Sequence, residues 1–148
     1  MRGGPWWREK FAGHGHRLTA PREAILEILI RSRKHLSAED VYMQVHKVYP
    51  GIGLATVYRT LELLRQMGLV SKFHFGDGRS RYEVAEGPGV QHHHHMVCRN
   101  CGRIIDCSEL IDEQEEAIKR LERTVSKKHK FKIESHQIRF FGLCEKCG

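Results

Sequence analysis

The chain has 148 residues and a formal net charge of +7, which allows one domain or two small ones. The first residues contain no apolar segment of the kind found in secretion signals, and no run of about 18 apolar residues could span a bilayer. We therefore expect a cytoplasmic protein without a membrane partner. Residues 1–85 hold 14 Lys and Arg against 8 Asp and Glu, and residues 86–148 hold 11 against 10. This asymmetry favours a polyanion-binding front half, although a solvated basic surface would give the same charge.

Three helices are predicted in the front half. Thr19-Ala20-Pro21 has the residue types that begin a helix, and an apolar face follows it up to Arg31. Ser37-Ala38-Glu39-Asp40 resembles a capping box, with Asp in place of the usual Glu, and opens a helix that stops at Pro50. Val57, Leu61 and Leu64 mark one face of a third helix, which ends at Gly68.

Two β-prone runs come next. Val70 to Phe75 and Arg79 to Val84 flank Gly76-Asp77-Gly78, a sequence typical of a β-hairpin turn. Three helices followed by a hairpin is the order of a winged helix-turn-helix. We therefore expect a DNA-binding domain over 1–85, a hinge or linker over 86–90 and a second domain over 91–148.

The rear half has mixed secondary structure. Arg103 to Asp106 is a candidate strand, and a helix is expected from about Ser108 to Lys128 because apolar residues recur there at helical spacing. Alternating apolar residues from Phe131 to Phe141 predict a final strand or pair of strands. The fold class is thus α+β, with a winged helix-turn-helix followed by a small α/β domain.

Four of the five cysteines form two CxxC pairs, Cys98 with Cys101 and Cys144 with Cys147. Two such knuckles surround one ion with four thiolates, the closed tetrahedral arrangement of structural Zn²⁺. In a reducing cytosol this spacing favours a metal over disulfides. Cys107 is expected to be a small buried residue. A zinc deaminase would need an H-x-E motif and a zinc hydrolase an HExxH motif, and the sequence contains neither.

Four histidines, His92 to His95, precede the first knuckle. In an extended strand, His93 and His95 point to one face while His92 and His94 point to the other. Imidazoles with carboxylates form an exchangeable site for iron, manganese, zinc, cobalt or nickel. The alternative, a set of exposed histidines that bind nothing, remains open.

Three segments carry a resemblance to a known family. They are Leu54-Ala55-Thr56-Val57-Tyr58-Arg59-Thr60-Leu61, Phe75-Gly76-Asp77-Gly78-Arg79-Ser80-Arg81-Tyr82-Glu83, and His93-His94-His95-Met96-Val97-Cys98-Arg99-Asn100-Cys101-Gly102. In this order they resemble the ferric uptake regulator (Fur) family of bacterial metal-responsive repressors, over about Leu18 to Cys147. The resemblance implies a winged-helix domain hinged to an α/β dimerisation domain, and no enzymatic activity or small-molecule substrate.

The resemblance also implies a role for particular residues. It places the four paired cysteines at the structural zinc. It implies a regulatory site between the domains with ligands His35, Glu83, His93, His95 and Asp106. A third family site would use His92, His94, Glu113 and His136, in which His94 replaces a frequent aspartate.

The third predicted helix would be the recognition helix in the DNA major groove. Its candidate base contacts are Ala55, Thr56, Tyr58 and Arg59, because Arg pairs with guanine while methyl and aromatic surfaces meet thymine. The alternative for Tyr58 is a half-buried packing residue. Candidate phosphate or minor-groove contacts are Arg17, Arg22, Arg79 and Arg81.

The expected function is therefore metal-dependent repression, in which a homodimer binds a palindromic operator in double-stranded DNA. Metal ligands from both domains would restrict the hinge and set the separation of the two winged helices. Iron (Fe²⁺) is favoured as the regulatory metal, with Mn²⁺ or Zn²⁺ as alternatives and with the peroxide-sensing and zinc-uptake branches still open. A metal-storage or trafficking protein would explain the histidines and cysteines but not the basic winged helix.

Overall fold

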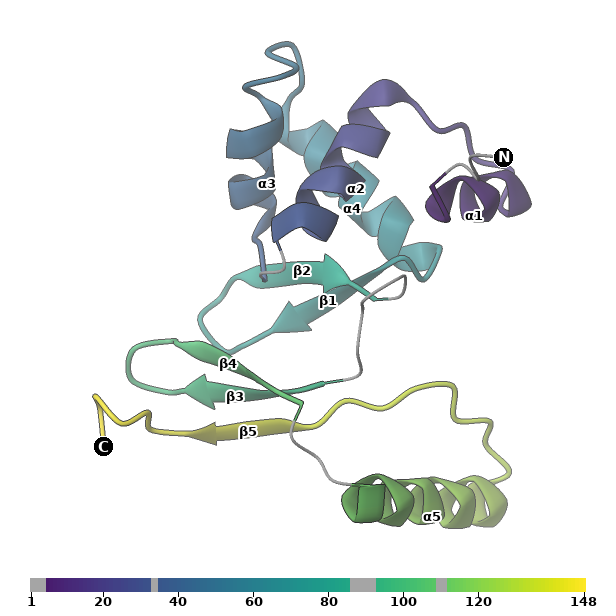
Figure 1. Cartoon of the computed structure of the whole chain (residues 1–148), viewed down its shortest axis with the longest axis vertical. Helices are drawn as coiled ribbons and strands as arrows, with labels where there is room; N and C mark the ends of the chain where they lie inside the picture. Colours follow the sequence, from purple (N-terminus) through teal and green to yellow (C-terminus); the bar gives the residue numbers. More distant parts are fainter. Residues whose placement is uncertain (1–4, 33–34, 86–92, 109–111) are drawn as a thin grey trace. The chain divides into compact units, whose positions relative to one another are not determined.

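The computed structural model describes residues 5–32, 35–85, 93–108 and 112–148 (Figure 1). The predicted linker, 86–90, lies outside these residues. The chain divides into two compact units, Met1–Val90 and Gln91–Gly148. In the ranges given above, no helix combines the length and the apolar character needed to cross a membrane.

The first unit contains the predicted three helices and hairpin, so the winged helix-turn-helix is confirmed. Its elements are α1 (Trp7–Gly13), α2 (Ala20–Ser32), α3 (Ala38–Val45), α4 (Leu54–Gln66), β1 (Val70–His74) and β2 (Ser80–Val84). Helices α2, α3 and α4 lie on one side of the hairpin (Figure 1). Helix α1 was not predicted, although Trp7 and Phe11 have the i, i+4 spacing of a helix face. Phe11 is buried in the core of this unit.

The capping box predicted at Ser37 is present and fixes the start of α3. The Asp40 N–H donates to Ser37 Oγ at 3.1 Å, and the Ser37 N–H donates to Asp40 Oδ2 at 2.9 Å. At the end of α4, Gly68 has φ +73°, a conformation that glycine adopts without strain. The following Leu69 N–H bonds back to the Leu64 carbonyl at 3.0 Å.

The core of the first unit is formed by the apolar faces of its helices. Val57, Leu61 and Leu64 are fully buried, as the spacing in α4 predicts. Ile25 and Leu26 from α2 and Val41 from α3 meet the same cluster. Burial of one such side chain contributes roughly 1.5–3 kcal/mol, so this packing holds α4 firmly by its inner face. The outer face of α4 is left to solvent.

The hairpin is extended by a third short segment. Leu36 pairs with Tyr82 in an isolated antiparallel bridge, with N–H to carbonyl distances of 3.1 and 2.8 Å. This bridge ties the residues before α3 to β2. Residues adjacent to the bridge, one on each strand, are therefore neighbours, which matters for His35.

The second unit is a three-stranded sheet with one helix. Its elements are β3 (His94–Cys98), β4 (Ile104–Cys107), α5 (Asp112–His129) and β5 (Arg139–Gly142). The strand order is β4-β3-β5, in which β3 is antiparallel to β4 and parallel to β5 (Figure 1). The start predicted for the long helix, about Ser108, is not seen: Ser108 is not helical, and residues 109–111 lie outside the described ranges.

The prediction of a strand from Phe131 is wrong over residues 131–138. Only Arg139–Gly142 forms a strand. The parallel register starts with His95 opposite Arg139, and β3 begins at His94, so β3 offers no partner to residues 131–137. Phe131 is exposed instead of packed.

Few apolar side chains are buried in the second unit. Among its described residues, Val97 and Cys98 are the only buried hydrophobic ones. Several large apolar side chains are exposed instead: Met96, Leu121, Val125, Phe131, Phe140, Phe141 and Leu143. A unit of this size with so little core needs additional constraints, such as a bound metal or a second subunit.

Candidate metal centres and nucleic-acid surface

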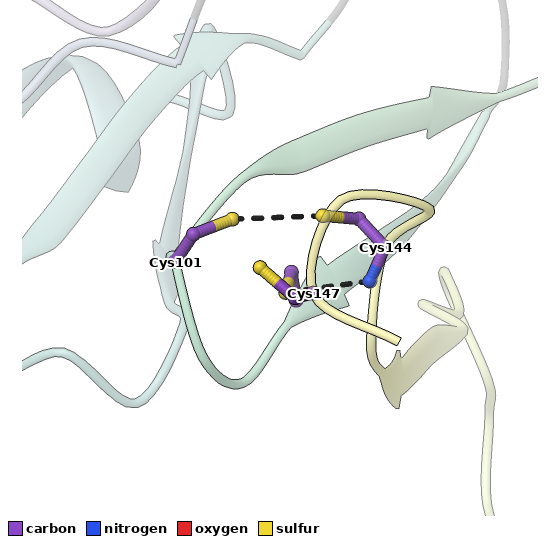
Figure 2. A group of neighbouring side chains, drawn as sticks. Cys101, Cys144 and Cys147 are labelled. Atoms are coloured by element: carbon purple, nitrogen blue, oxygen red, sulfur yellow. Dashed lines mark hydrogen bonds between the residues drawn. The ribbon is translucent and has the colours of Figure 1, made fainter.

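The four paired cysteines come together in the second unit, which confirms the predicted cluster. Cys98 ends β3, and Cys101 lies in the turn that leads to β4. The parallel pairing places Cys98 opposite Gly142, so the second knuckle, Cys144 to Cys147, begins two residues beyond. Figure 2 shows the sulfurs of Cys101, Cys144 and Cys147 directed toward one another.

The geometry of this cluster fits one tetrahedral ion. The four Sγ atoms lie within 4.8 Å of one another, and Cys101 Sγ is 3.7 Å from Cys144 Sγ. Zn–S bonds of about 2.3 Å at tetrahedral angles require sulfurs about 3.8 Å apart, whereas a disulfide requires about 2.05 Å. All five cysteines are free thiols. The donor set therefore suits Zn²⁺ with no open position.

Backbone N–H groups prepare Cys98 for metal binding. Hydrogen bonds from the backbone of Cys101 and then of Cys144 lower the pKa of the Cys98 thiol to about 6. The Cys144 N–H lies 3.4 Å from Cys98 Sγ. Because the thiolate is the form that binds metal, these bonds favour the ligand state at neutral pH. Cys107, predicted to be buried, is half-buried in β4 opposite His94 and is not part of the cluster.

A second ligand group in the same unit consists of His93, His95 and Asp106. The β3–β4 register pairs His95 with Asp106, and the His95 Nε2 to Asp106 Oδ1 distance is 3.7 Å. His93 Nε2 lies 4.0 Å from the same oxygen, and the two imidazole rings are 4.9 Å apart. The rings share one side of the strand, as period-two alternation predicts. Two imidazoles and a carboxylate form a borderline donor set that suits Fe²⁺, Mn²⁺ or Zn²⁺.

A third ligand group lies in the first unit. His35 Nε2 is 2.8 Å from Glu83 Oε2, and both side chains are largely buried. The Leu36–Tyr82 bridge explains this contact, because His35 and Glu83 flank the paired residues. Phe73 and Phe75 stand edge-on to the His35 ring, with centroids 6.2 and 5.7 Å away. The packing holds the imidazole in one orientation.

The residues of the further metal site that the family resemblance implies are only partly brought together. His94 is buried and stacks on His136 with ring centroids 5.7 Å apart. His136 Nδ1 lies 2.7 Å from Glu122 Oε1. Glu113 is exposed and lies nine residues from Glu122, about 13 Å along α5 and on its opposite face. The carboxylate beside His136 is therefore that of Glu122. His92 lies outside the described residues.

The outer face of α4 carries the side chains expected to meet DNA. Ala55, Tyr58 and Arg59 are exposed, and Tyr58 keeps 41% of its accessible surface. Thr56 is half-buried, and its Oγ1 accepts a hydrogen bond from Arg59 Nη2 at 3.4 Å. The alternative role for Tyr58, a half-buried packing residue, is also compatible with this exposure.

The four arginines predicted to contact phosphates differ in their surroundings. Arg17 and Arg79 are exposed. Arg22 donates to the Arg17 carbonyl at 2.7 Å, and Arg81 donates to Asp77 Oδ2 at 2.6 Å across the hairpin turn. Arg79 and Arg17 thus have the side chains most available to a polyanion.

Two contacts were missed by reasoning from the sequence. Glu39 accepts a hydrogen bond from the Tyr58 hydroxyl at 2.8 Å, and Glu122 faces His136. The signal for Glu122 was its position on the face of α5 that carries Ile118, four residues earlier. No pattern in the sequence links Glu39 to Tyr58, which lie on different helices.

Comparisons of sequence and of structure with known proteins point to the same family. The model of the Ferric uptake regulator family matches residues 13–141. The ferric uptake regulation protein of Bacillus subtilis (strain 168) is 42% identical over 143 residues, covering 95% of this chain and 91% of that protein. The peroxide operon regulator of the same strain is 32% identical over 134 residues, covering 90% and 86%. A structure of the Helicobacter pylori ferric uptake regulator that reveals three functional metal binding sites has TM-score 0.72 at 28% identity, covering 95% and 87%.

Proposed function

Since this chain belongs to the ferric uptake regulator family of metal-responsive transcription regulators, which are not enzymes, we propose that it is a metal-dependent repressor of transcription. It binds a palindromic DNA operator as a homodimer when its regulatory site is filled. The observation that carries this proposal is the pair of ligand groups, His93 with His95 and Asp106 in one unit and His35 with Glu83 in the other.

We propose that both ligand groups bind the same ion. Each group is held by its own sheet pairing, so neither unit needs to refold when the ion joins them. The bound metal ion would be coordinated by donor atoms of both groups at once. His35 and Glu83 then restrain the DNA-binding unit at the hinge, which fixes the separation of the two winged helices in the dimer. A coupling of about 1–3 kcal/mol would raise operator affinity roughly 5- to 150-fold.

Iron is the proposed regulatory metal. The support is the 42% identity to a ferric uptake regulation protein, against 32% to a peroxide operon regulator. Asp106 is compatible with both branches, and the donor set also accepts Mn²⁺ and Zn²⁺. The four thiolates hold a structural Zn²⁺ that does not exchange. His94, His136 and Glu122 form the core of a further metal site. Its carboxylate ligand is Glu122, in place of the Glu113 that the resemblance implies.

The second unit is the proposed dimer contact. Its exposed apolar side chains, such as Phe140 and Leu143, lie on β5 and beside the second cysteine knuckle. Burying them against a second copy would remove from water the largest apolar groups that the small core leaves exposed.

The test replaces His93 and His95 with Ala together. Operator duplex is first selected from a random-sequence library with Mn²⁺-loaded protein, and affinity is then measured with Fe²⁺, Mn²⁺, Zn²⁺ or chelator. We expect the wild type to bind roughly 5- to 150-fold tighter with metal and the variant to lose this difference, because the shared ion has lost two ligands.

His129→Ala is the matched control, because His129 is an exposed histidine of the same unit. It should keep the metal response. Retention of one zinc per chain in the double variant would show that the thiolate site is intact. An unchanged metal response in the double variant would exclude His93 and His95 as regulatory ligands.

A further inference from the structure

An acidic residue is bonded to the surface proposed to meet DNA. Glu39 is the second residue of α3, and its Oε1 accepts the hydrogen bond from the Tyr58 hydroxyl on α4 at 2.8 Å. Glu39 and Tyr58 are both exposed, so the pair lies at the surface where α3 meets α4. A carboxylate beside a polyanion is repelled by it, so its presence on this surface calls for a functional explanation.

The charge state of the pair is fixed by its surroundings. The Tyr58 hydrogen bond is the main cause that lowers the pKa of Glu39, and the nearby charge of Arg79 lowers it further. The same bond raises the pKa of the Tyr58 phenol. At neutral pH Glu39 is therefore an anion and Tyr58 keeps its proton, so the bond is charge-assisted.

We infer that Glu39 is a positioning residue, which orients the Tyr58 ring for operator recognition and raises the preference for operator over other DNA. This inference rests on the proposed function. Tyr58 presents its ring from the exposed face of α4, and a tyrosine side chain has two rotatable torsions. Anchoring the hydroxyl removes this freedom before DNA arrives, so the ring face is presented to a thymine methyl in one orientation.

The negative charge adds a second contribution. A carboxylate next to phosphates is unfavourable in any register, and nonspecific binding depends almost entirely on phosphate contacts. The charge therefore lowers the affinity for operator and for other DNA alike, and the preference for operator comes from the oriented Tyr58 ring.

A purely structural role for Glu39 predicts different behaviour. Glu39 lies in the first turn of α3, where an acidic side chain interacts favourably with the helix dipole. In that role its loss would lower stability without involving Tyr58. The two roles are separated by a double-mutant cycle between Glu39 and Tyr58.

The experiment uses the full-length protein loaded with Mn²⁺ and compares operator with scrambled duplex at one salt concentration. The variants are Glu39→Ala, Tyr58→Phe, the double variant and Glu39→Gln. We expect Glu39→Ala and Tyr58→Phe each to lower the operator preference by about 3- to 10-fold, the scale of one hydrogen bond. The double variant should be no worse than the larger single effect.

Glu39→Gln keeps an oxygen that accepts from the Tyr58 hydroxyl but carries no charge. It should restore much of the operator preference lost in Glu39→Ala, while the affinity for both duplexes rises above that of the wild type because the negative charge is gone. The matched control is Glu62→Ala, which removes a half-buried carboxylate of α4 that bonds to Arg65 and not to Tyr58. Its operator preference should equal that of the wild type.

Additive effects of Glu39→Ala and Tyr58→Phe, or an unchanged preference in Glu39→Ala, would overturn the inference. If those variants bind like the wild type while metal still controls binding, only the role of Glu39 fails. If the wild type itself shows no metal-dependent operator binding, the proposed function fails and the inference fails with it.

Discussion

At the scale of single residues, the front half of the molecule is stabilised by short-range hydrogen bonds that the sequence pattern predicts. Ser37 and Asp40 exchange backbone and side-chain bonds within four residues, and they satisfy N–H groups that the first turn of α3 leaves without helical partners. Ser37 is buried, so its hydroxyl needs this partner. The cap also fixes the chain direction just after His35 and Leu36.

Replacing Asp40 with Asn should destabilise the first unit by about 1 kcal/mol, because the charge-assisted bonds to Ser37 are weakened. Unfolding in urea is followed by the fluorescence of Trp6 and Trp7, the only tryptophans, which both belong to this unit.

The pH dependence of this effect follows from the pKa of Asp40, which the side-chain bond to Ser37 lowers. A group with a lowered folded pKa stabilises above its unfolded pKa and loses that contribution as pH falls through the folded pKa. The gap between wild type and variant should be full at pH 7 and close in acid. A gap that stays constant down to pH 2 would contradict the assignment.

At the scale of elements, the position of a residue on its helix face decides which ligands are available. Helix α5 runs from Asp112 to His129, and the side chain that reaches His136 is on its second half. The acid nine residues earlier points the other way. The sequence does not show at which residue the helix begins, and a shift of one residue rotates a side chain by about 100°. The sequence alone therefore could not decide which acidic residue of α5 faces His136.

Glu122→Ala and Glu113→Ala form a matched pair for the further metal site. We expect Glu122→Ala to weaken binding of the most weakly held metal by about 10-fold or more, because His136 loses its carboxylate neighbour. Glu113→Ala should leave all metal affinities unchanged. Titration of zinc-replete protein with Mn²⁺, read by isothermal calorimetry, measures both. The reverse order of effects would restore Glu113 as the ligand.

At the scale of the whole molecule, the two units are stabilised differently. The first has a continuous hydrophobic core from Phe11 to Tyr82. Among the described residues of the second, Val97 and Cys98 are the only buried apolar ones, and the two CxxC knuckles connect its first and last strands. We therefore expect the fold of the second unit, and not that of the first, to depend on the four-thiolate site.

Cys101→Ser should abolish retention of one zinc per chain and expose β3 and β5 to amide hydrogen exchange, since metal binding supplies folding free energy to small domains. The fluorescence of Trp6 and Trp7 should not change. Cys107→Ser is the control, because Cys107 is not part of the cluster, and it should keep both zinc and protection. Full zinc retention by Cys101→Ser would exclude the four-cysteine site.

The sequence by itself determined the features that depend on local pattern. The apolar faces of α2, α3 and α4, the Ser37 cap and the glycine turn of the hairpin all act within a few residues, so spacing alone predicts them. The two CxxC pairs also predict that the four cysteines come together, because in a reducing compartment this spacing indicates a metal site and not disulfides.

Only the tertiary structure decided the contacts between distant segments. The register of β3 with β5 limits the last strand to Arg139–Gly142, and it aligns Cys98 with the second knuckle. The Leu36–Tyr82 bridge brings His35 to Glu83, and the packing of α3 against α4 brings Glu39 to Tyr58. These pairs lie far apart in sequence, and their distances follow from strand register and helix packing, which no local pattern encodes.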